Sequence, residues 1–344
     1  MADLFPNFET HRVSVPSSGA GDAAAEPIEI FCRRRVPATS KDGATAGKAL
    51  LLIHGHPQTH HIWHRVAAQL VEQEPECELV VVDTRGMGQS SKPAIRDAQG
   101  RSNYTKRRCA DDLVAVMRHF GHQSFYVAGH DRGARIGHRM LVDHGASVVR
   151  SAVFIDIAPT VDMYRLGDSR FGMLYWHWYF LAQPAPIPET FLVSAPEAYL
   201  GRLTNIGRGS SDASAKVAAA AAAAAAAAKD DVFHPTAVAA YRGNIATMDS
   251  AAAMCEDYRA SAPGGEDAVA DEEDRAAGRK VPQPLHLLWG SSGVIELLYG
   301  GAVDLWQQRC EHPVQARPVE TGHYVPEEAP EEVVKEIRAV LRHE

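Results

Sequence analysis

One five-residue segment, Gly129-His130-Asp131-Arg132-Gly133, constrains the fold of this chain more than any other. Residues 124–128 precede it with the aromatic and β-branched content of a buried strand, and residues 134–140 follow with a pattern that can form a helix. Glycines on both sides of a reactive residue permit a strained turn, because a Cβ at either flank would collide with the neighbouring backbone. The segment therefore predicts that Asp131 projects from a tight strand-to-helix corner.

The reactive residue at this corner is a carboxylate, and this limits its chemistry. A carboxylate is already ionised at neutral pH and suits displacement at a saturated carbon, which leaves an ester on the enzyme that water must then cleave. The alternative is a structural loop aspartate, because Asp and Gly are both common turn residues. The other segments of the chain help to decide between a catalytic and a structural Asp131.

Length and composition are those of an ordinary globular protein. The 344 residues, 45% of them hydrophobic, suffice for one large domain or for a core with a smaller insertion. A net charge of −8, with no basic stretch interleaved with aromatics, argues against a nucleic-acid partner. The first residues lack a secretory pattern, and the most apolar stretch, residues 171–182, is too short for a bilayer. We expect a cytoplasmic protein that does not enter the membrane.

Alternating strand and helix patterns predict a doubly wound α/β fold with a mostly parallel sheet. The segments that show this pattern are an opening antiparallel strand near residues 29–33, apolar runs at 49–53, 78–83 and 151–156, and a helical pattern at 104–119. After residue 157 the strand signal disappears, and aromatic-rich and alanine-rich helical segments take its place. The expected organisation is a core at 1–157, an inserted helical cap at 158–280 with a near-pure alanine insertion at 218–228, and the rest of the core at 281–344.

Histidines and cysteines raise the question of a metal site. His60 and His64 stand four apart and could share a helical face, but no third ligand has a recognisable spacing, and Trp63 with its apolar neighbours favours an amphipathic surface helix. The five cysteines are far apart, odd in number and without a C-x-x-C pair, so we expect free thiols. The sequence predicts no metal and no cofactor.

Two more residues have the character of an acid and a base. Asp156 ends an apolar run, and functional residues of open parallel sheets gather at that edge, although a strand-end Asp is often only a turn residue. His323 lies in a Thr-Gly-His segment near the C-terminus. The loop after the next-to-last strand, residues 289–294, holds no carboxylate before Glu296, which makes Asp156 the better partner for His323.

These segments resemble the fluoroacetate dehalogenases (haloacetate dehalogenases) of the α/β-hydrolase superfamily. The resemblance runs from about Phe5 to the C-terminal helix, outside the alanine insertion, and it is carried by HGHPQTHHIWHRV, DTRGMGQSSKP, AGHDRGARIGHRM, IDIAPT, YWHWYFLAQPAP and TGHYVPEEAPEEV. It implies an α/β-hydrolase fold in which Asp131 is the nucleophile, His323 the base and Asp156 the acid. It also implies an oxyanion hole formed by the backbone N–H groups of His56 and Arg132.

The resemblance further implies how a haloacid would be held. Arg132 and Arg135 would bind the substrate carboxylate bidentately, near a helix N-terminus that itself favours an anion. The alternative is a pair of surface arginines that bridge to Asp or Glu. His177, Trp178 and Tyr241 would donate hydrogen bonds to the leaving halide, although aromatic clusters on cap helices more often serve packing.

The expected activity is hydrolysis of short 2-haloacids, most simply fluoroacetate, to 2-hydroxyacid and halide through an ester on Asp131. An epoxide hydrolase with the same three residues is the alternative, with cap tyrosines such as Tyr199 as donors; Arg132 and Arg135 argue against a neutral epoxide. A non-catalytic ligand-binding protein on the same scaffold is a third interpretation. The family resemblance also implies a homodimer.

Overall fold

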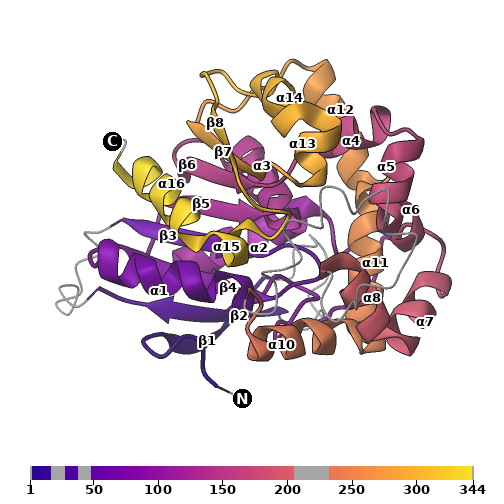
Figure 1. The fold of residues 1–344 in the computed structure, drawn as a ribbon, viewed down its shortest axis with the longest axis horizontal. Helices are drawn as coiled ribbons and strands as arrows, with labels where there is room; N and C mark the ends of the chain where they lie inside the picture. The colour runs from indigo at the N-terminus through magenta and orange to yellow at the C-terminus, as the bar shows by residue number, and fades with distance from the viewer. Residues whose placement is uncertain (1, 17–27, 38–47, 205–231, 343–344) are drawn as a thin grey trace.

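The computed structural model describes residues 2–16, 28–37, 48–204 and 232–342. One eight-stranded sheet with the order β1-β2-β4-β3-β5-β6-β7-β8 forms its centre (Figure 1). The strands β1 and β2 join antiparallel to each other, β2 joins antiparallel to β4, and all later pairs are parallel. The strands are β1 Glu9–Val15, β2 Ile28–Arg35, β3 Ala49–Ile53, β4 Glu78–Val82, β5 Phe125–His130, β6 Val149–Ile155, β7 Leu285–Gly290 and β8 Gln315–Val319.

The predicted α/β-hydrolase architecture is confirmed, and strand β3 shows why the sequence signal is so clear. All five residues of β3 are buried, because helices cover both faces of the sheet. Leu50 and Leu52 pack into the apolar cluster under α1 and α16, whereas Leu51 and Ile53 pack with α2 and α3. The helices of the core are α1 His64–Gln73, α2 Lys106–His119, α3 Arg132–His144, α13 Val294–Tyr299, α14 Val303–Gln307, α15 Val325–Glu328 and α16 Pro330–Arg342.

Between β6 and β7, helices are the only regular elements among the described residues. They gather along one side of the sheet, at the right of Figure 1. These cap helices are α4 Thr160–Arg165, α5 Ser169–Leu174, α6 Trp176–Leu181, α7 Ile187–Ser194, α8 Pro196–Thr204, α10 Pro235–Ile245, α11 Met248–Ser261 and α12 Glu266–Ala276. The alanine insertion expected at 218–228 lies outside the described residues.

Asn244 of α10 ties the cap to the core. Its side-chain oxygen accepts the Gly88 N–H at 2.8 Å, and its amide nitrogen lies 3.3 Å from the Pro57 carbonyl oxygen and 3.4 Å from that of Gln58. One buried cap side chain thus bridges two loops at the carboxyl edge of the sheet, the edge that also carries Asp131.

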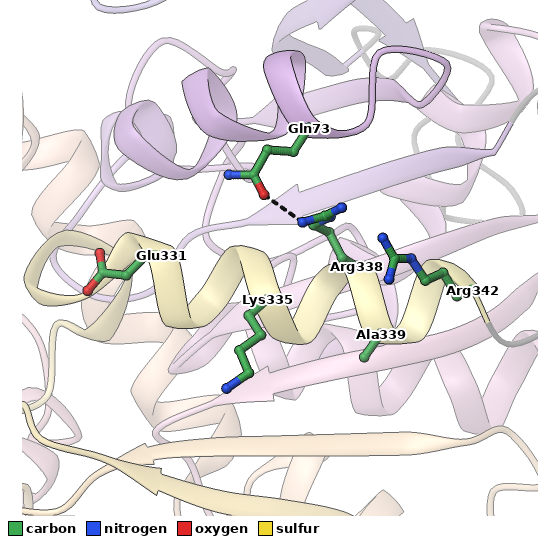
Figure 2. Close-up of a pocket in the computed structure, with 6 residues that line it drawn as sticks. All are labelled: Gln73, Glu331, Lys335, Arg338, Ala339 and Arg342. Carbon is green, nitrogen blue, oxygen red and sulfur yellow. Dashed lines mark hydrogen bonds between the residues drawn. The ribbon is translucent and has the colours of Figure 1, made fainter.

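A shallow hollow on the outer surface of the core lies away from that edge, over α16 and its neighbour α1 (Figure 2). All of its lining residues except Ala339 have polar or charged side chains, and Arg338 of α16 donates a hydrogen bond to Gln73 at 2.8 Å. The lining residues are Gln73, Glu331, Lys335, Arg338, Ala339 and Arg342. This hollow belongs to the packing of α1 against α16.

Metal ligands do not gather in the described part of the chain, where no three His, Cys, Asp or Glu side chains are placed to hold an ion. His60 lies in a short 3₁₀ turn, and both its backbone N–H and its ring Nδ1 bond Asp83. The five cysteines are buried free thiols. None of the described helices combines the length and apolar character needed to span a bilayer.

Candidate active site

The elbow after β5 has the geometry that the sequence predicts. Asp131 is buried and adopts φ 48°, a left-handed conformation that non-glycine residues seldom occupy. A Cβ on Gly129 would lie 2.6 Å from the Ala134 backbone nitrogen, and one on Gly133 would collide with the carbonyl oxygen of Ile53. Both glycines are therefore needed for α3 to leave the sheet directly after Asp131.

The Asp131 carboxylate accepts a hydrogen bond from the backbone. The His56 N–H donates to Asp131 Oδ2 at 3.0 Å, and Gly55 permits the approach because a Cβ there would lie 2.6 Å from the Cβ of Asp131. Arg132 is the first residue of α3, so its N–H has no partner within the helix. Burial opposes ionisation of Asp131, but the neighbouring His323, Arg132 and Arg135 keep its pKa below the usual range.

Asp156 and His323 form a tight pair beside this carboxylate. His323 Nδ1 lies 2.5 Å from Asp156 Oδ2, and the other carboxylate oxygen accepts the Gly290 N–H at 2.9 Å. Burial alone would lower the pKa of His323, but the hydrogen bond and charge of Asp156 raise it. Glu296 instead accepts a hydrogen bond from Trp289 Nε1 at 2.5 Å, so Asp156 is the carboxylate that contacts the His323 ring.

Two supports of His323 were not foreseen from the sequence. His130 Nε2 donates to the His323 carbonyl oxygen at 2.8 Å, and the Glu328 carboxylate accepts the N–H groups of Gly322 and Tyr324 on either side of it. Such contacts fix the loop and leave the ring free to act. The His130 contact joins residues far apart in the chain, whereas the Glu328 contacts lie within one short segment, and no pattern in the sequence marks either of them.

Arg135 is a buried guanidinium without an acidic partner among the described residues. Its Nη1 donates to Thr160 Oγ1, its Nη2 lies 2.9 Å from Met163 Sδ, and the group packs 4.7 Å over the ring of Trp178. Burial and the nearby charge of Arg132 lower the pKa of Arg135 to about 10. A buried cation left in this state is costly unless an anion joins it.

Arg132 has a partner that the sequence did not suggest. Its Nε pairs with the Asp257 carboxylate, and its Nη2 donates at 2.8 Å to both the Asp257 carbonyl oxygen and Ser261 Oγ. The guanidinium also lies 3.9 Å over the Tyr258 ring. Arg132 is thus an arginine bridged to Asp, but buried within the molecule and not on the surface.

The aromatic cluster holds two of its three expected members. His177 and Trp178 lie together on α6, and the ring centroid of Tyr258 on α11 lies 5.9 Å from that of His177 and 6.0 Å from that of Trp178. Burial keeps the pKa of His177 well below its usual value, so the ring is neutral. Its Nδ1 is buried, and no hydrogen-bond partner for it is described.

Tyr241 lies elsewhere, which corrects the expectation that it completes this cluster. It is on α10, where its hydroxyl donates to Glu327 Oε1 at 3.0 Å, while Gln58 donates to Glu327 Oε2 at 2.6 Å. Tyr258 takes the place expected for Tyr241. The segment Cys255-Glu256-Asp257-Tyr258-Arg259 is a second place in the cap where a tyrosine precedes an arginine, but nothing in the local sequence distinguishes it from an ordinary helix face.

Comparison with known proteins agrees with this geometry. Residues 48–204 match the family model of the alpha/beta hydrolase fold. Over 297 residues the chain is 36% identical to a fluoroacetate dehalogenase from Burkholderia sp, covering 86% of this chain and 88% of the relative. The chain belongs to the fluoroacetate dehalogenase family of the α/β-hydrolase superfamily. It is accordingly a hydrolase.

Two further relatives place this family member in the wider superfamily. A soluble epoxide hydrolase from Corynebacterium sp. (strain C12) is 25% identical over 85% of this chain and 89% of its own length. A crystal structure from Nostoc sp PCC 7120, provisionally classed as an alpha/beta hydrolase, is 35% identical with a TM-score of 0.79 and covers 98% of this chain and 99% of its own. Both dehalogenase and epoxide hydrolase chemistry are therefore found among its relatives.

Proposed function

We propose that this hydrolase cleaves the carbon–halogen bond of short 2-haloacids, such as fluoroacetate or chloroacetate, and releases the 2-hydroxyacid and the halide. The observation that carries the proposal is the buried, acid-free guanidinium of Arg135 one turn of α3 beyond the carboxylate of Asp131. An anionic substrate supplies the charge that Arg135 lacks, and its carboxylate then holds the neighbouring carbon beside Asp131.

The first step uses the free oxygen of Asp131. Oδ2 accepts the His56 N–H, so Oδ1 is the atom that attacks the carbon bearing the halogen. The Oδ1–carbon bond forms as the carbon–halogen bond breaks, and the bonding pair leaves with the halide. Donor groups of His177, Trp178 and Tyr258 replace water around the leaving ion, which matters most for the strongly hydrated fluoride.

The second step hydrolyses the ester on Asp131. His323 takes a proton from water, and Asp156 stabilises the imidazolium that forms through the Nδ1 hydrogen bond. The hydroxide adds to Asp131 Cγ, and the negative charge develops on Oδ2, where the His56 N–H already points. The Cγ–Oδ1 bond then breaks, and the hydroxyacid leaves with Oδ1 after receiving the proton from His323. Asp131 is left as a carboxylic acid and releases its proton to solvent, which restores the carboxylate.

The epoxide hydrolase alternative draws support from the similarity to the Corynebacterium enzyme and from the tyrosines of the cap. Tyr199 hydrogen-bonds His56 Nε2 at 2.8 Å, so that hydroxyl is engaged beside the oxyanion donor. A neutral epoxide would leave Arg135 buried without an anion, and this is the physical reason to prefer a haloacid.

Halide release from fluoroacetate and chloroacetate, with styrene oxide opening assayed in parallel, tests the proposal. Asp131→Ala should abolish release of either halide, because it removes the carboxylate that forms the ester. Single turnover in ¹⁸O-water should give hydroxyacid without the label, since its new oxygen comes from Asp131. Halide release that survives Asp131→Ala, or epoxide opening without halide release, would contradict the proposal.

A further inference from the structure

Arg132 and Arg135 lie one turn apart on α3 but have opposite electrostatic surroundings. Arg135 has no carboxylate at ion-pair distance among the described residues, whereas Arg132 is paired with Asp257 of the cap helix α11. If both served a bound carboxylate equally, the site would present two uncompensated cations. It presents one.

Asp257 is the centre of a buried cluster of charges. Its carboxylate pairs with Arg132 of α3 and with Lys106 at the start of α2, and Lys106 Nζ also lies 3.6 Å from Asp267 Oδ2. Burial opposes ionisation of Asp257, but Arg132 and Lys106 keep its pKa below the usual value. Two cations and two carboxylates therefore balance one another in the cluster before any ligand binds.

The cluster also restricts which nitrogen atoms of Arg132 remain for a ligand. Asp257 and Ser261 occupy Nε and Nη2, and the Tyr258 ring covers one face of the guanidinium. Nη1 of Arg132 is buried and has no hydrogen-bond partner among the described residues, as is also true of Nε of Arg135. Arg132 is held in place by the cap and keeps one nitrogen to offer.

We propose that Asp257 is a positioning residue that weakens the hold of the site on its carboxylate ligand, by fixing Arg132 and offsetting its charge so that Arg135 is the main anchor. The identity of the ligand rests on the proposed function. The hydroxyacid product carries the same carboxylate as the substrate, so affinity for that group slows product release as much as it aids substrate binding. Asp257 limits that affinity.

Equilibrium binding of acetate and acetamide, measured by calorimetry, separates charge from shape and needs no turnover. Asp257→Asn removes the charge and keeps one oxygen that can face Arg132, while its amide NH2 replaces the oxygen that faces Lys106. The Kd for acetate should fall about tenfold, equivalent to about 1.4 kcal/mol, while the Kd for acetamide stays within about twofold. Glycolate should become a correspondingly stronger inhibitor of the variant.

Asp274→Asn is the matched control. Asp274 is a buried aspartate of α12 that pairs at 2.5 Å with Arg139, one turn beyond Arg135 on α3, so the change removes the same charge without touching a site arginine. Its acetate Kd should match that of the unmodified protein. If lost charge anywhere in the cap tightened acetate binding, the role given to Asp257 would be wrong.

Lys106→Met should change the acetate Kd in the opposite direction, and it tests the proposal even if Asp257→Asn does not fold. Without Lys106 the Asp257 charge is less compensated, so acetate should bind several-fold more weakly and acetamide should be unaffected. A rise in the acetate Kd of Asp257→Asn, or parallel changes for acetate and acetamide, would overturn the inference. If the variants show these changes in acetate Kd but the unmodified protein releases no halide, only the proposed reaction is refuted.

Discussion

Replacing Arg135 by methionine should stabilise the protein while removing its activity. The side chain lies among apolar neighbours, over Trp178 and against Met163, and methionine can fill much of the same space. The change removes a charge that has no carboxylate at ion-pair distance among the described residues. The prediction thus gives stability and function opposite signs, as expected for a group that is held in the site at a cost in stability.

The size of the effect follows from the pKa of Arg135. Burial and Arg132 lower it to about 10, and at about 1.4 kcal/mol for each tenfold change in acidity this corresponds to a penalty of about 3 kcal/mol at neutral pH. The sign is destabilising because the unfolded chain holds the guanidinium in water. Losing the hydrogen bond to Thr160 returns about 1 kcal/mol. The net gain in unfolding free energy is about 2 kcal/mol.

Urea unfolding at pH 7 and halide release from chloroacetate check the two halves of this prediction. Loss of two charge-assisted hydrogen bonds to the substrate, at about 2 kcal/mol each, should lower kcat/KM by about 10³-fold. Added acetate should stabilise the unmodified protein and leave Arg135→Met unchanged. Arg135→Lys, which keeps a cation without the guanidinium fork, should gain no stability. A clear loss of stability in Arg135→Met would refute the reasoning.

Three further changes have defined outcomes. Asp156→Asn should lower kcat by about 10³-fold, and it should move the acidic limb of the pH profile to lower pH, because Asp156 raises the pKa of His323, which must be neutral to accept a proton. Gly133→Ala should lower the unfolding free energy by several kcal/mol in a urea titration, because its Cβ meets fixed backbone. Tyr258→Phe should reduce fluoride release about tenfold more than chloride release, since fluoride depends more on donors.

Matched variants control these outcomes. Gly243→Ala adds a Cβ where nothing lies within 4 Å, so it should be neutral or stabilise α10 by about 0.5–1 kcal/mol. Tyr241→Phe should leave the ratio of fluoride to chloride release unchanged, because its hydroxyl bonds Glu327. An acidic limb that stays fixed in Asp156→Asn would argue against His323 as the base.

The fold, the elbow at Asp131 and the pairing of Asp156 with His323 could be predicted because their signals are local. The strand-to-helix corner needs glycine at positions 129 and 133, and Asp131 lies between them in the sequence. The signal is therefore contained in five consecutive residues. Asp156 could be chosen because no carboxylate precedes Glu296 after the next-to-last strand, and in the structure Glu296 lies within α13 and accepts a hydrogen bond from Trp289 Nε1.

The surroundings of the site could not be predicted because they depend on contacts across the cap. Tyr241 and Tyr258 both lie on helices with similar sequence character, and only the packing of α10 and α11 decides which ring reaches His177. Likewise, the partner of Arg132 is 125 residues further along the chain, and no spacing rule links the two.

The attachment of α10 has a mechanical consequence. Asn244 is bonded to the loop that carries His56, the proposed oxyanion donor, and Tyr241 is bonded to Glu327, four residues beyond His323, the proposed base. If the cap moved while these bonds were kept, α10 would stay fixed on the core, and the cap helices farthest from α10 would move most. For protein engineering, α10 and the catalytic loops form one unit, so a cap grafted from a relative would have to bring matching partners for Pro57 and Glu327.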